Sequence, residues 1–496
     1  MKRYIGTWSK ESEDSPKVAE LIIDGNQIEF YRRDYGEVFP CAFVGTDGEH
    51  KYKVFTNGRS FVNTNKTLEL STSYRTFFVL QQNDDFPEGV EITGIKDVSF
   101  IIPELIDWID VETVEFGADE EQNLIAGERK LPSIILHDRN PHIEIQYESE
   151  SFTKYHNVDT RTTFVLKNQP RIFITYENTV DVHRVREDIN TLMQFWGLLI
   201  GYVSSAEDIR LSIDRKSLKS WLYINKDFSY NSRSRSTIDK PRTTLEKSLE
   251  NIEKYFTEWY KFCYDDKYEL IRRMYFSANS CKEIFAEDIL VQYVKIIEGY
   301  NLRVSGDEEI ALELRKAFKD VEKDIKRLIF SDKGKPLFTT ALEKVIPEWT
   351  FNSGHSADVA HWISVGYLGK KGLAERIKEL DEKYFCIIAK NAIDILKLSR
   401  SDKIDPSSVS TKQLVELFYR KIVATRNYYS HYKSDKTDVL EFRQMNDTIN
   451  VLKALILSIL FSHMGMSEKE IFEIISNDSE LRFQTMFLSS TSVDTK

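Results

Sequence analysis

Apolar and polar residues alternate in short runs along the first 178 residues, and this pattern predicts β-strands. Residues 19–23 and 27–31 flank Asp24-Gly25-Asn26, and an Asp-Gly turn between two such runs is a strong signal for a β-hairpin. Further runs follow at residues 50–56, 67–80, 90–102, 133–137, 142–147, 162–166 and 171–176. Many short strands at regular spacing predict a β-sandwich or an irregular barrel.

The spacing of apolar residues changes to that of a helix at residue 179. A helix is predicted over residues 179–202, two short strand-like runs follow at 209–213 and 221–224, and a Ser- and Arg-rich linker is predicted over 228–242. From there to residue 476 the pattern is almost entirely helical, with amphipathic stretches at 288–299, 308–330, 380–398, 410–433 and 447–464. The predicted fold class is therefore α+β, with a β-rich N-terminal half followed by an all-α helical bundle.

The length of 496 residues allows roughly two to four domains. The pattern divides the chain into a β-rich domain at 1–178, a connecting region at 179–283, an α-helical domain at 284–476 and a tail at 477–496. A helix start is predicted at Thr243, because Thr243 and Glu246 have the spacing of a capping box.

Composition narrows the class of protein. Hydrophobic residues make up 41% of the chain and charged residues 30%, which is typical of a soluble globular protein. The formal net charge of -11 argues against a protein that coats nucleic acid, so any RNA contact must come from a local basic patch. Four scattered cysteines form no CxxC pair and indicate free thiols in a reducing cytoplasm.

The chain shows no membrane or export signal. Its N-terminus lacks the apolar core of a signal peptide, and no uninterrupted apolar run approaches the ~20 residues of a membrane span. The longest apolar stretch, at 451–461, contains Lys453 and indicates a buried helix. We therefore expect a cytoplasmic protein that makes no membrane contact.

The strongest pointer to chemistry is the segment Arg426-Asn427-Tyr428-Tyr429-Ser430-His431 within the predicted helix 410–433. On a helix, Asn427 and His431 lie one turn apart and face the same way, and Arg426 lies about 140° from His431 around the axis. The surroundings are basic, since one acid, Glu416, stands against five cations: Lys412, Arg420, Lys421, Arg426 and Lys433.

These residue types suit cleavage of a phosphodiester. An imidazole can move protons near neutral pH, a guanidinium can bind a phosphate and stabilise charge that builds on it, and an amide can hold either in register. No carboxylate cluster stands near the motif, so a metal-independent reaction without a cofactor is predicted. An RNA substrate would supply its own nucleophile, the 2′-hydroxyl, and leave a cyclic phosphate and a 5′-hydroxyl.

The motif resembles the RNase motif of HEPN domains, which are small α-helical domains of many prokaryotic toxins and phage-defence nucleases. The whole chain, with a β-rich half that opens Gly6-Thr7-Trp8, resembles the ApeA class of anti-phage HEPN proteins. The resemblance implies an endoribonuclease that acts in abortive infection, with tRNA as the suspected target and Arg426, Asn427 and His431 as catalytic residues.

The resemblance also implies an assembly, a homodimer or higher homo-oligomer in which two motif helices meet across a twofold axis, and a possible phage-derived trigger acting on a sensing or regulatory N-terminal half. Contacts with RNA are predicted for Arg420, Lys421, Tyr432 and Lys433. Some antitoxin-regulated members carry a Tyr two residues after the His, where this chain has Lys433.

Two other functions stay open. The chain could be a non-catalytic HEPN-type nucleic-acid-binding or interaction protein, regulated through its β-rich half, in which Arg426 and His431 only cap or form salt bridges. It could also be a ligand-binding regulator whose function lies in residues 1–178. No other segment offers a competing catalytic motif, since His137, His142 and His156 lack the spacing of metal ligands.

Overall fold

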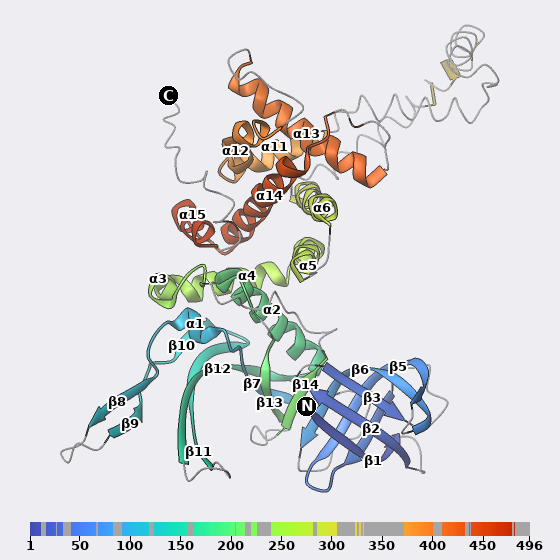
Figure 1. Cartoon of the computed structure of the whole chain (residues 1–496), viewed down its shortest axis with the longest axis vertical. Coiled ribbons are helices and arrows are strands. Elements are labelled where there is room, and N and C mark those ends of the chain that lie inside the picture. Colours follow the sequence, from blue (N-terminus) through green and yellow to red (C-terminus); the bar gives the residue numbers. More distant parts are fainter. Residues whose placement is uncertain are drawn as a thin grey trace. The chain divides into compact units, whose positions relative to one another are not determined.

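The structure is a computed structural model of the chain, shown in Figure 1. It describes residues 1–10, 16–25, 27–32, 41–65, 68–82, 92–118, 124–155, 162–203, 205–213, 220–225, 240–280, 285–304, 323–324, 327–328, 331, 372–399, 409–431, 436, 438–478 and 481. Side chains are not described at 58–73, 75, 124–125, 152–155, 162–165 and 280. The predicted linker at 228–242 and the predicted helix at 308–330 therefore fall almost wholly outside the described residues.

Contacts divide the chain into two compact units that interleave in sequence. Unit 1 comprises Met1–Asp265, Phe276–Lys282 and Leu460–Met486, and unit 2 comprises Asp266–Tyr275, Glu283–Ile459 and Phe487–Lys496. The division of the sequence at residues 178, 283 and 476 stays a prediction, and the two units are described separately below.

Unit 1 contains a closed antiparallel barrel of six strands (Figure 1). The strands are β1 (Lys2–Lys10), β2 (Lys17–Asp24), β3 (Gln27–Arg32), β4 (Cys41–Thr46), β5 (Lys51–Asn65) and β6 (Leu68–Gln82). They pair in the order β6-β3-β2-β1-β4-β5, and β5 closes the barrel by pairing with β6. Aromatic rings fill its interior, where Trp8 packs edge-on against Phe30 at 5.2 Å. Of the two architectures predicted for residues 1–178, a sandwich or an irregular barrel, the strands up to Gln82 form a barrel.

A glycine makes room for the largest ring in this barrel. Trp8 is only 1% exposed, and a Cβ built on Gly45 of the neighbouring strand β4 would lie 2.3 Å from the indole. Because strand and indole are both held by packing, a side chain at Gly45 would force the ring out of the core.

The sheet divides at β6. One edge of β6 pairs with β5, and the other pairs first with β3 at Thr72–Tyr74 and then with β14 (Ser220–Ile224) at Phe78–Gln81. Asn225 ties the two branches together, because its side chain donates to Ile28 O at 2.9 Å and its backbone N–H donates to Phe77 O at 3.0 Å. The barrel therefore continues into a second sheet without a break in hydrogen bonding.

That second sheet runs from β14 in the order β13, β7, β12, β11 and β10. The strands are β7 (Ile95–Ile101), β10 (Ile134–Asp138), β11 (His142–Tyr155), β12 (Thr162–Val180) and β13 (Glu207–Ile213), and a separate hairpin is formed by β8 (Val114–Ala118) and β9 (Leu124–Glu128). The two strands predicted at 162–166 and 171–176 are parts of one long strand, β12. The short runs predicted at 209–213 and 221–224 are confirmed as β13 and β14.

Helices complete unit 1. They are α1 (Leu105–Ile109), α2 (Val182–Ile200), α3 (Leu245–Ser248), the 3-10 turn Leu249–Asn251, α4 (Ile252–Cys263) and α15 (Glu468–Asn477). α2 begins at Asp181, whose side chain accepts from Arg184 N at 2.8 Å, and it buries Trp196 against Trp108 of α1 at 4.6 Å. This confirms the helix predicted at 179–202. The observed helix begins three residues later and ends two residues earlier than predicted.

The predicted helix start at Thr243 is wrong. α3 begins at Leu245 with Thr244 as its N-cap, and that residue makes no side-chain capping bond. The backbone N–H of Thr243 instead donates to Leu199 O at 3.2 Å, so tertiary contact with the end of α2 overrides the local capping signal. A capping box does form at Ser467 and Glu470 of α15.

A buried ion pair joins residues far apart in sequence within unit 1. Arg242 Nε lies 2.6 Å from Asp478 Oδ2, and the two side chains are 6% and 2% exposed. The guanidinium also donates to Leu198 O at 2.9 Å, at the end of α2. Asp478 lies just past the start of the predicted tail, and its burial makes it part of the packed unit.

Unit 2 is helical. Its elements are α6 (Ala286–Val304), α11 (Leu373–Lys383), α12 (Ile387–Leu396), α13 (Thr411–His431), most of α14 (Phe442–His463) and the first part of α5 (Asp266–Ser280). α13 packs against α6, α11 and α12. Together with the sheets of unit 1, these helices confirm the predicted α+β fold class.

The single helix predicted at 380–398 is in fact two helices. α11 ends at Lys383 and α12 begins at Ile387, because Phe385 and Cys386 adopt left-handed backbone angles with φ 77° and 55°. Buried Asp381 stabilises the break, since its carboxylate accepts from Ile388 N at 2.7 Å and Ala389 N at 2.9 Å. Burial raises the pKa of this carboxyl, and its hydrogen bonds oppose that rise.

The described part of the chain contains one helix, α14, that is long and apolar enough to cross a membrane. Of its most apolar window, 78% is buried inside the protein, which is the behaviour of a core helix in a soluble protein. Leu452, Leu455 and Leu457 in this helix are essentially inaccessible to solvent.

Candidate active site on α13

Arg426 bridges α13 and α6. Its Nη2 donates to Glu298 Oε2 on α6 at 3.1 Å, and its Nη1 donates to Asn427 Oδ1 at 3.0 Å. The Arg426 and Glu298 side chains are 17% and 27% exposed, so the ion pair lies at the edge of the helical core. The structure therefore brings the first two predicted catalytic residues into direct contact.

The guanidinium of Arg426 is only partly used by these contacts. It carries five N–H donors, and two hydrogen bonds to other described residues engage it. Its Nε is buried and has no partner in the described part of the chain. Because this atom is inaccessible to solvent, an oxyanion would reach the guanidinium through the unused Nη hydrogens of a side chain that is 17% exposed.

His431 is the last residue of α13 and is exposed. At about 100° per residue, Arg420, Asn427 and His431 fall within roughly 40° of one another, on one stripe of the helix. Among the described residues, His431 makes no hydrogen bond or ion pair. Its imidazole is thus accessible, on the same face as Asn427 and one turn further along.

The predicted RNA-contacting residues differ in position. Arg420 is exposed on the stripe, whereas Lys421 is only 4% exposed and its Nζ lies 3.9 Å from Asp438 Oδ1. Lys421 therefore points into unit 2, and its burial removes it from the set of surface contacts. Tyr432 and Lys433 lie outside the described residues.

Thr425 fixes the end of α13 that carries the motif. Its hydroxyl donates to Lys421 O at 2.7 Å and accepts from Leu440 N at 2.8 Å, and the side chain is fully buried. Leu440 lies just before α14, so this bond ties the motif helix to the segment that enters the next helix. Loss of that anchor would loosen Arg426 and Asn427, which follow Thr425 directly.

Two tyrosines accompany the motif. The rings of Tyr428 and Tyr429 are 5.0 Å apart at an interplanar angle of 86°, and Lys436 Nζ lies 5.8 Å from the centre of the Tyr428 ring. Burial, and then Glu287 on α6, raise the pKa of Tyr429, which keeps this hydroxyl protonated at neutral pH. Both rings are half-buried, so each combines packing with a polar edge.

Glu298 is the residue that the sequence pattern does not reveal. It precedes its partner Arg426 by 128 positions and belongs to no motif. Its helical setting was predicted, since Glu298 lies in the stretch 288–299, but only the packing of α6 on α13 brings the carboxylate to the arginine. Within the described part of the chain, no group of three or more His, Cys, Asp or Glu side chains is placed to hold a metal ion.

Two known family models match the chain, one over its N-terminal half and one over its C-terminal half. A family model for the ApeA N-terminal domain 1 matches residues 3–259, and one for the Apea-like HEPN domain matches residues 291–470. The chain belongs to the ApeA class of HEPN proteins. The HEPN match contains Glu298 and all of α13, so the site described above lies within the HEPN domain.

Membership of the ApeA class confirms the resemblance found in the sequence and indicates a HEPN nuclease type of function in anti-phage defence. No curated protein and no solved structure matches the chain.

Proposed function

We propose that this ApeA-class protein is a metal-independent endoribonuclease that acts in abortive infection and cuts tRNA or another cellular RNA. The observation that carries the proposal is the Arg426–Asn427 pair, held by Glu298, next to the exposed imidazole of His431. These groups supply a phosphate-binding cation, an orienting amide and a proton-transfer group on one helix end within the HEPN domain.

In the proposed reaction, the 2′-oxygen of the substrate attacks the adjacent phosphorus. The bond from phosphorus to the 5′-oxygen breaks, and the products are a 2′,3′-cyclic phosphate and a 5′-hydroxyl. The 2′-hydroxyl loses a proton and the leaving 5′-oxygen gains one, and His431 is assigned to this proton transfer. Arg426 stabilises the charge on the non-bridging phosphate oxygens, and Asn427 orients the phosphate or the imidazole.

Glu298 has a positioning role in this scheme. It holds one edge of the Arg426 guanidinium at 3.1 Å and leaves the unused Nη hydrogens for the substrate. A pre-oriented guanidinium loses less freedom when it binds the phosphate than a mobile one does. Arg420, exposed on the same stripe as Asn427 and His431, is proposed to contact the RNA backbone.

Removal of one proton and delivery of another suit two imidazoles better than one. A twofold arrangement of α13 helices would supply both from one motif, so a homodimer or a higher homo-oligomer is proposed as the active form. The proposal places the protein in the cytoplasm, where its RNA substrate lies, with a phage-derived signal as the trigger.

The test is cleavage of total tRNA by the purified protein in EDTA. The wild-type protein should give discrete fragments ending in a cyclic phosphate, and His431→Ala should lower the rate by ~10²–10⁴. His142→Ala, which removes a histidine of unit 1 that is 37% exposed, serves as the matched control and should keep full activity. Because His431 is exposed, its variant should remain folded, so equal activity in His431→Ala and wild type would exclude the assignment.

A second candidate function is favoured by the ion pair itself. Arg426 and Glu298 join two helices of unit 2, as expected if the motif were only a structural seam of an RNA-binding or interaction protein. In that case Arg426→Met should loosen the fold or the assembly. In the nuclease, the variant should keep its oligomeric state in analytical ultracentrifugation and lose cleavage.

A further inference from the structure

The candidate site lies on the part of α13 that the core of unit 2 covers least. Thr425 is the last buried residue of the helix, residues 426–430 are half-buried, and His431 is exposed. The last four carbonyl groups of a helix also lack intrahelical partners, and such terminal turns open at little cost in free energy. The proposed cleavage needs the site residues in one fixed geometry, so a contact beyond the packing of the helix must hold this end.

The connection between α13 and α14 folds back toward the helix. Its described residues include Lys436 and residues 438–440, called the strap below. Val439 N donates to Lys436 O at 3.2 Å, which closes a tight turn. Asp438 in this turn has φ 63°, a left-handed angle that aspartate adopts more readily than most residues. A turn of this kind reverses the direction of the chain.

The strap contacts α13 at three positions. Each contact joins one strap residue to one helix residue: Leu440 N to Thr425 Oγ1 at 2.8 Å, Asp438 Oδ1 to Lys421 Nζ at 3.9 Å, and Lys436 Nζ to the centre of the Tyr428 ring at 5.8 Å. The three helix residues are spaced i, i+4 and i+7, so they form one stripe about 60° wide and about 10 Å long. The strap therefore follows one face of α13 into the turn that carries the motif.

The strap and Glu298 hold the end of α13 from two sides and leave a third side open. Arg426, which Glu298 of α6 holds, lies about 130° around the helix axis from the middle of the strap stripe. Asn427 and His431 lie about 110° from it in the other direction. A substrate can thus reach Asn427 and His431 while the strap stays in place.

Thr425 makes the firmest of the three contacts. Its hydroxyl is buried and uses both its donor and an acceptor site, since it also donates to Lys421 O at 2.7 Å. The Asp438 contact is longer, and Asp438 is 53% exposed, so solvent screens that ion pair. The backbone N–H of Leu440 would lose its buried acceptor without the Thr425 hydroxyl, which favours separation of the strap from the helix.

We propose that the strap keeps the motif-bearing end of α13 helical, and that Thr425 is a positioning residue for RNA cleavage. Thr425 touches none of the reacting groups and acts through the backbone of the residues that follow it. Loss of its hydroxyl raises the fraction of molecules in which the last turns of α13 are open and the site is not assembled. The effect on the rate rests on the proposed function, whereas the order of the helix end can be measured without it.

The test compares Thr425→Val with Thr425→Ser in the full chain. Valine keeps the shape of the side chain and removes the hydroxyl, whereas serine keeps the hydroxyl. Thr448→Val is the matched control, because Thr448 on α14 is equally buried and its hydroxyl also donates to the carbonyl four residues earlier, Gln444 O at 2.6 Å. Among the described residues, Thr448 makes no side-chain bond to another segment, so its variant tests burial and the intrahelical bond alone.

Hydrogen exchange read by mass spectrometry measures the helix end directly. The amides of residues 426–431 should exchange about three- to tenfold faster in Thr425→Val, the factor that corresponds to one lost hydrogen bond. Thr425→Ser and Thr448→Val should exchange there like wild type. In cleavage of total tRNA in EDTA, Thr425→Val should lower kcat by a similar factor with little change in KM, because orientation matters most in the transition state. Thr425→Ser and Thr448→Val should keep full activity.

A second variant keeps the test decisive if Thr425→Val folds poorly. Asp438→Asn changes a half-exposed side chain, so it should fold, and it should speed exchange at residues 426–431 by a smaller factor. Unchanged exchange there in both folded variants would overturn the strap. Faster exchange with an unchanged kcat in Thr425→Val would overturn the positioning role. If the wild-type protein cuts no RNA, the proposed function and that role fail together, and the exchange rates still decide whether the strap holds the helix end.

Discussion

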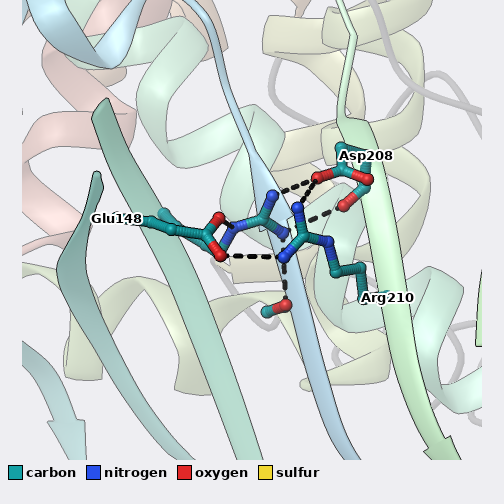
Figure 2. Close-up of polar contacts among 5 residues, drawn as sticks. Glu148, Asp208 and Arg210 are labelled. Carbon is teal, nitrogen blue, oxygen red and sulfur yellow. Dashed lines mark hydrogen bonds and ion pairs between the residues drawn. The ribbon is translucent and has the colours of Figure 1, made fainter. Parts of the chain in front are cut away.

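The two units use arginine in opposite ways. Arg171 in unit 1 is nearly inaccessible and makes four hydrogen bonds, to Glu148, to Ser99 and to the side chain and backbone of Asp208 (Figure 2). Arg426 in unit 2 makes two, to Asn427 and Glu298, and its Nε has no partner among the described residues. One guanidinium is nearly saturated by the fold, whereas the other keeps free donors at the edge of a helical core.

The number of hydrogen bonds that each arginine makes within the fold distinguishes an arginine that stabilises the structure from one that can bind a substrate. A buried arginine with most of its donors engaged has little left to offer a ligand, and its removal leaves the groups that it bonded without that partner. An unsaturated arginine held by one carboxylate is already oriented and can still accept a phosphate. An unpartnered Nε is not by itself distinctive in the described part of the chain, since Arg186, Arg210 and Arg376 have one too. Arg426 differs in its contact with Asn427 on the helix end that carries His431.

The largest expected effect comes from making the same substitution, arginine to methionine, at Arg426 and at Arg171 in turn. Arg426→Met should lower RNA cleavage by ~10²–10³, because a preorganised charge is lost from the transition state, and should leave urea unfolding nearly unchanged. Arg171→Met should lower the free energy of unfolding of unit 1 by ~1–3 kcal/mol, because its buried hydrogen bonds are lost while Arg210 still pairs with the half-exposed carboxylates of Glu148 and Asp208. Cleavage assays and urea denaturation on both variants measure the two effects side by side.

The opposite result, a loss of stability in Arg426→Met, would contradict this prediction. A strongly destabilised Arg426→Met protein would mean that the Arg426–Glu298 pair is a structural bridge, as in the non-catalytic alternative. Arg210→Met is a useful intermediate, since Arg210 pairs with the same two carboxylates as Arg171 but is 30% exposed, and its loss should cost less stability.

Much of the fold of unit 1 follows from local pattern, and its exceptions have a physical cause. β3 alternates strictly between exposed or half-buried and buried positions, so its period is visible in the sequence. β1 is exposed or half-buried except at Trp8, and β4 is buried at nearly every position, so neither strand shows that period. The pairings of β1 with β4 and of β3 with β6 join strands that are not neighbours in sequence, so no short window contains them.

The candidate site, too, could be predicted from the sequence only where it depends on neighbouring residues of one helix. The order Arg426, Asn427, His431 on a helix is local and could be predicted, whereas Glu298 joins the site only through the packing of α6 on α13. Burial of Lys421 depends on Asp438, which lies beyond the end of the helix, so the basic pattern of the sequence overstated the RNA-contacting surface. The break at Phe385 and Cys386 carries no glycine or proline and was not predicted for that reason.

A smaller effect is expected at the carboxylate that holds Arg426. Glu298→Gln keeps the shape of the side chain and one acceptor for Nη2 but removes its charge, so the guanidinium loses part of its orientation. We expect cleavage to fall about tenfold, with a larger share of the loss in kcat than in KM, because orientation matters most in the transition state. Asp288→Asn, at an exposed carboxylate of the same helix α6, serves as control. A rise in activity in Glu298→Gln would show instead that Glu298 competes with the phosphate and holds the site inactive.

The smallest effect is expected at Arg420. Arg426 is proposed to stabilise the scissile phosphate, whereas Arg420 is proposed only to bind the RNA backbone. Arg420 is exposed about 11 Å along the helix from Asn427, two turns away. If it neutralises one phosphate, Arg420→Gln should weaken RNA binding severalfold at low salt and reduce the slope of log affinity against log salt by about 0.7, the value for one contact to a single strand. Lys412→Gln on the same helix lies off the stripe and should leave that slope unchanged. An unaltered slope in Arg420→Gln would confine the RNA contact to the end of α13 that carries Asn427 and His431, and would leave the catalytic assignment of Arg426 as it stands.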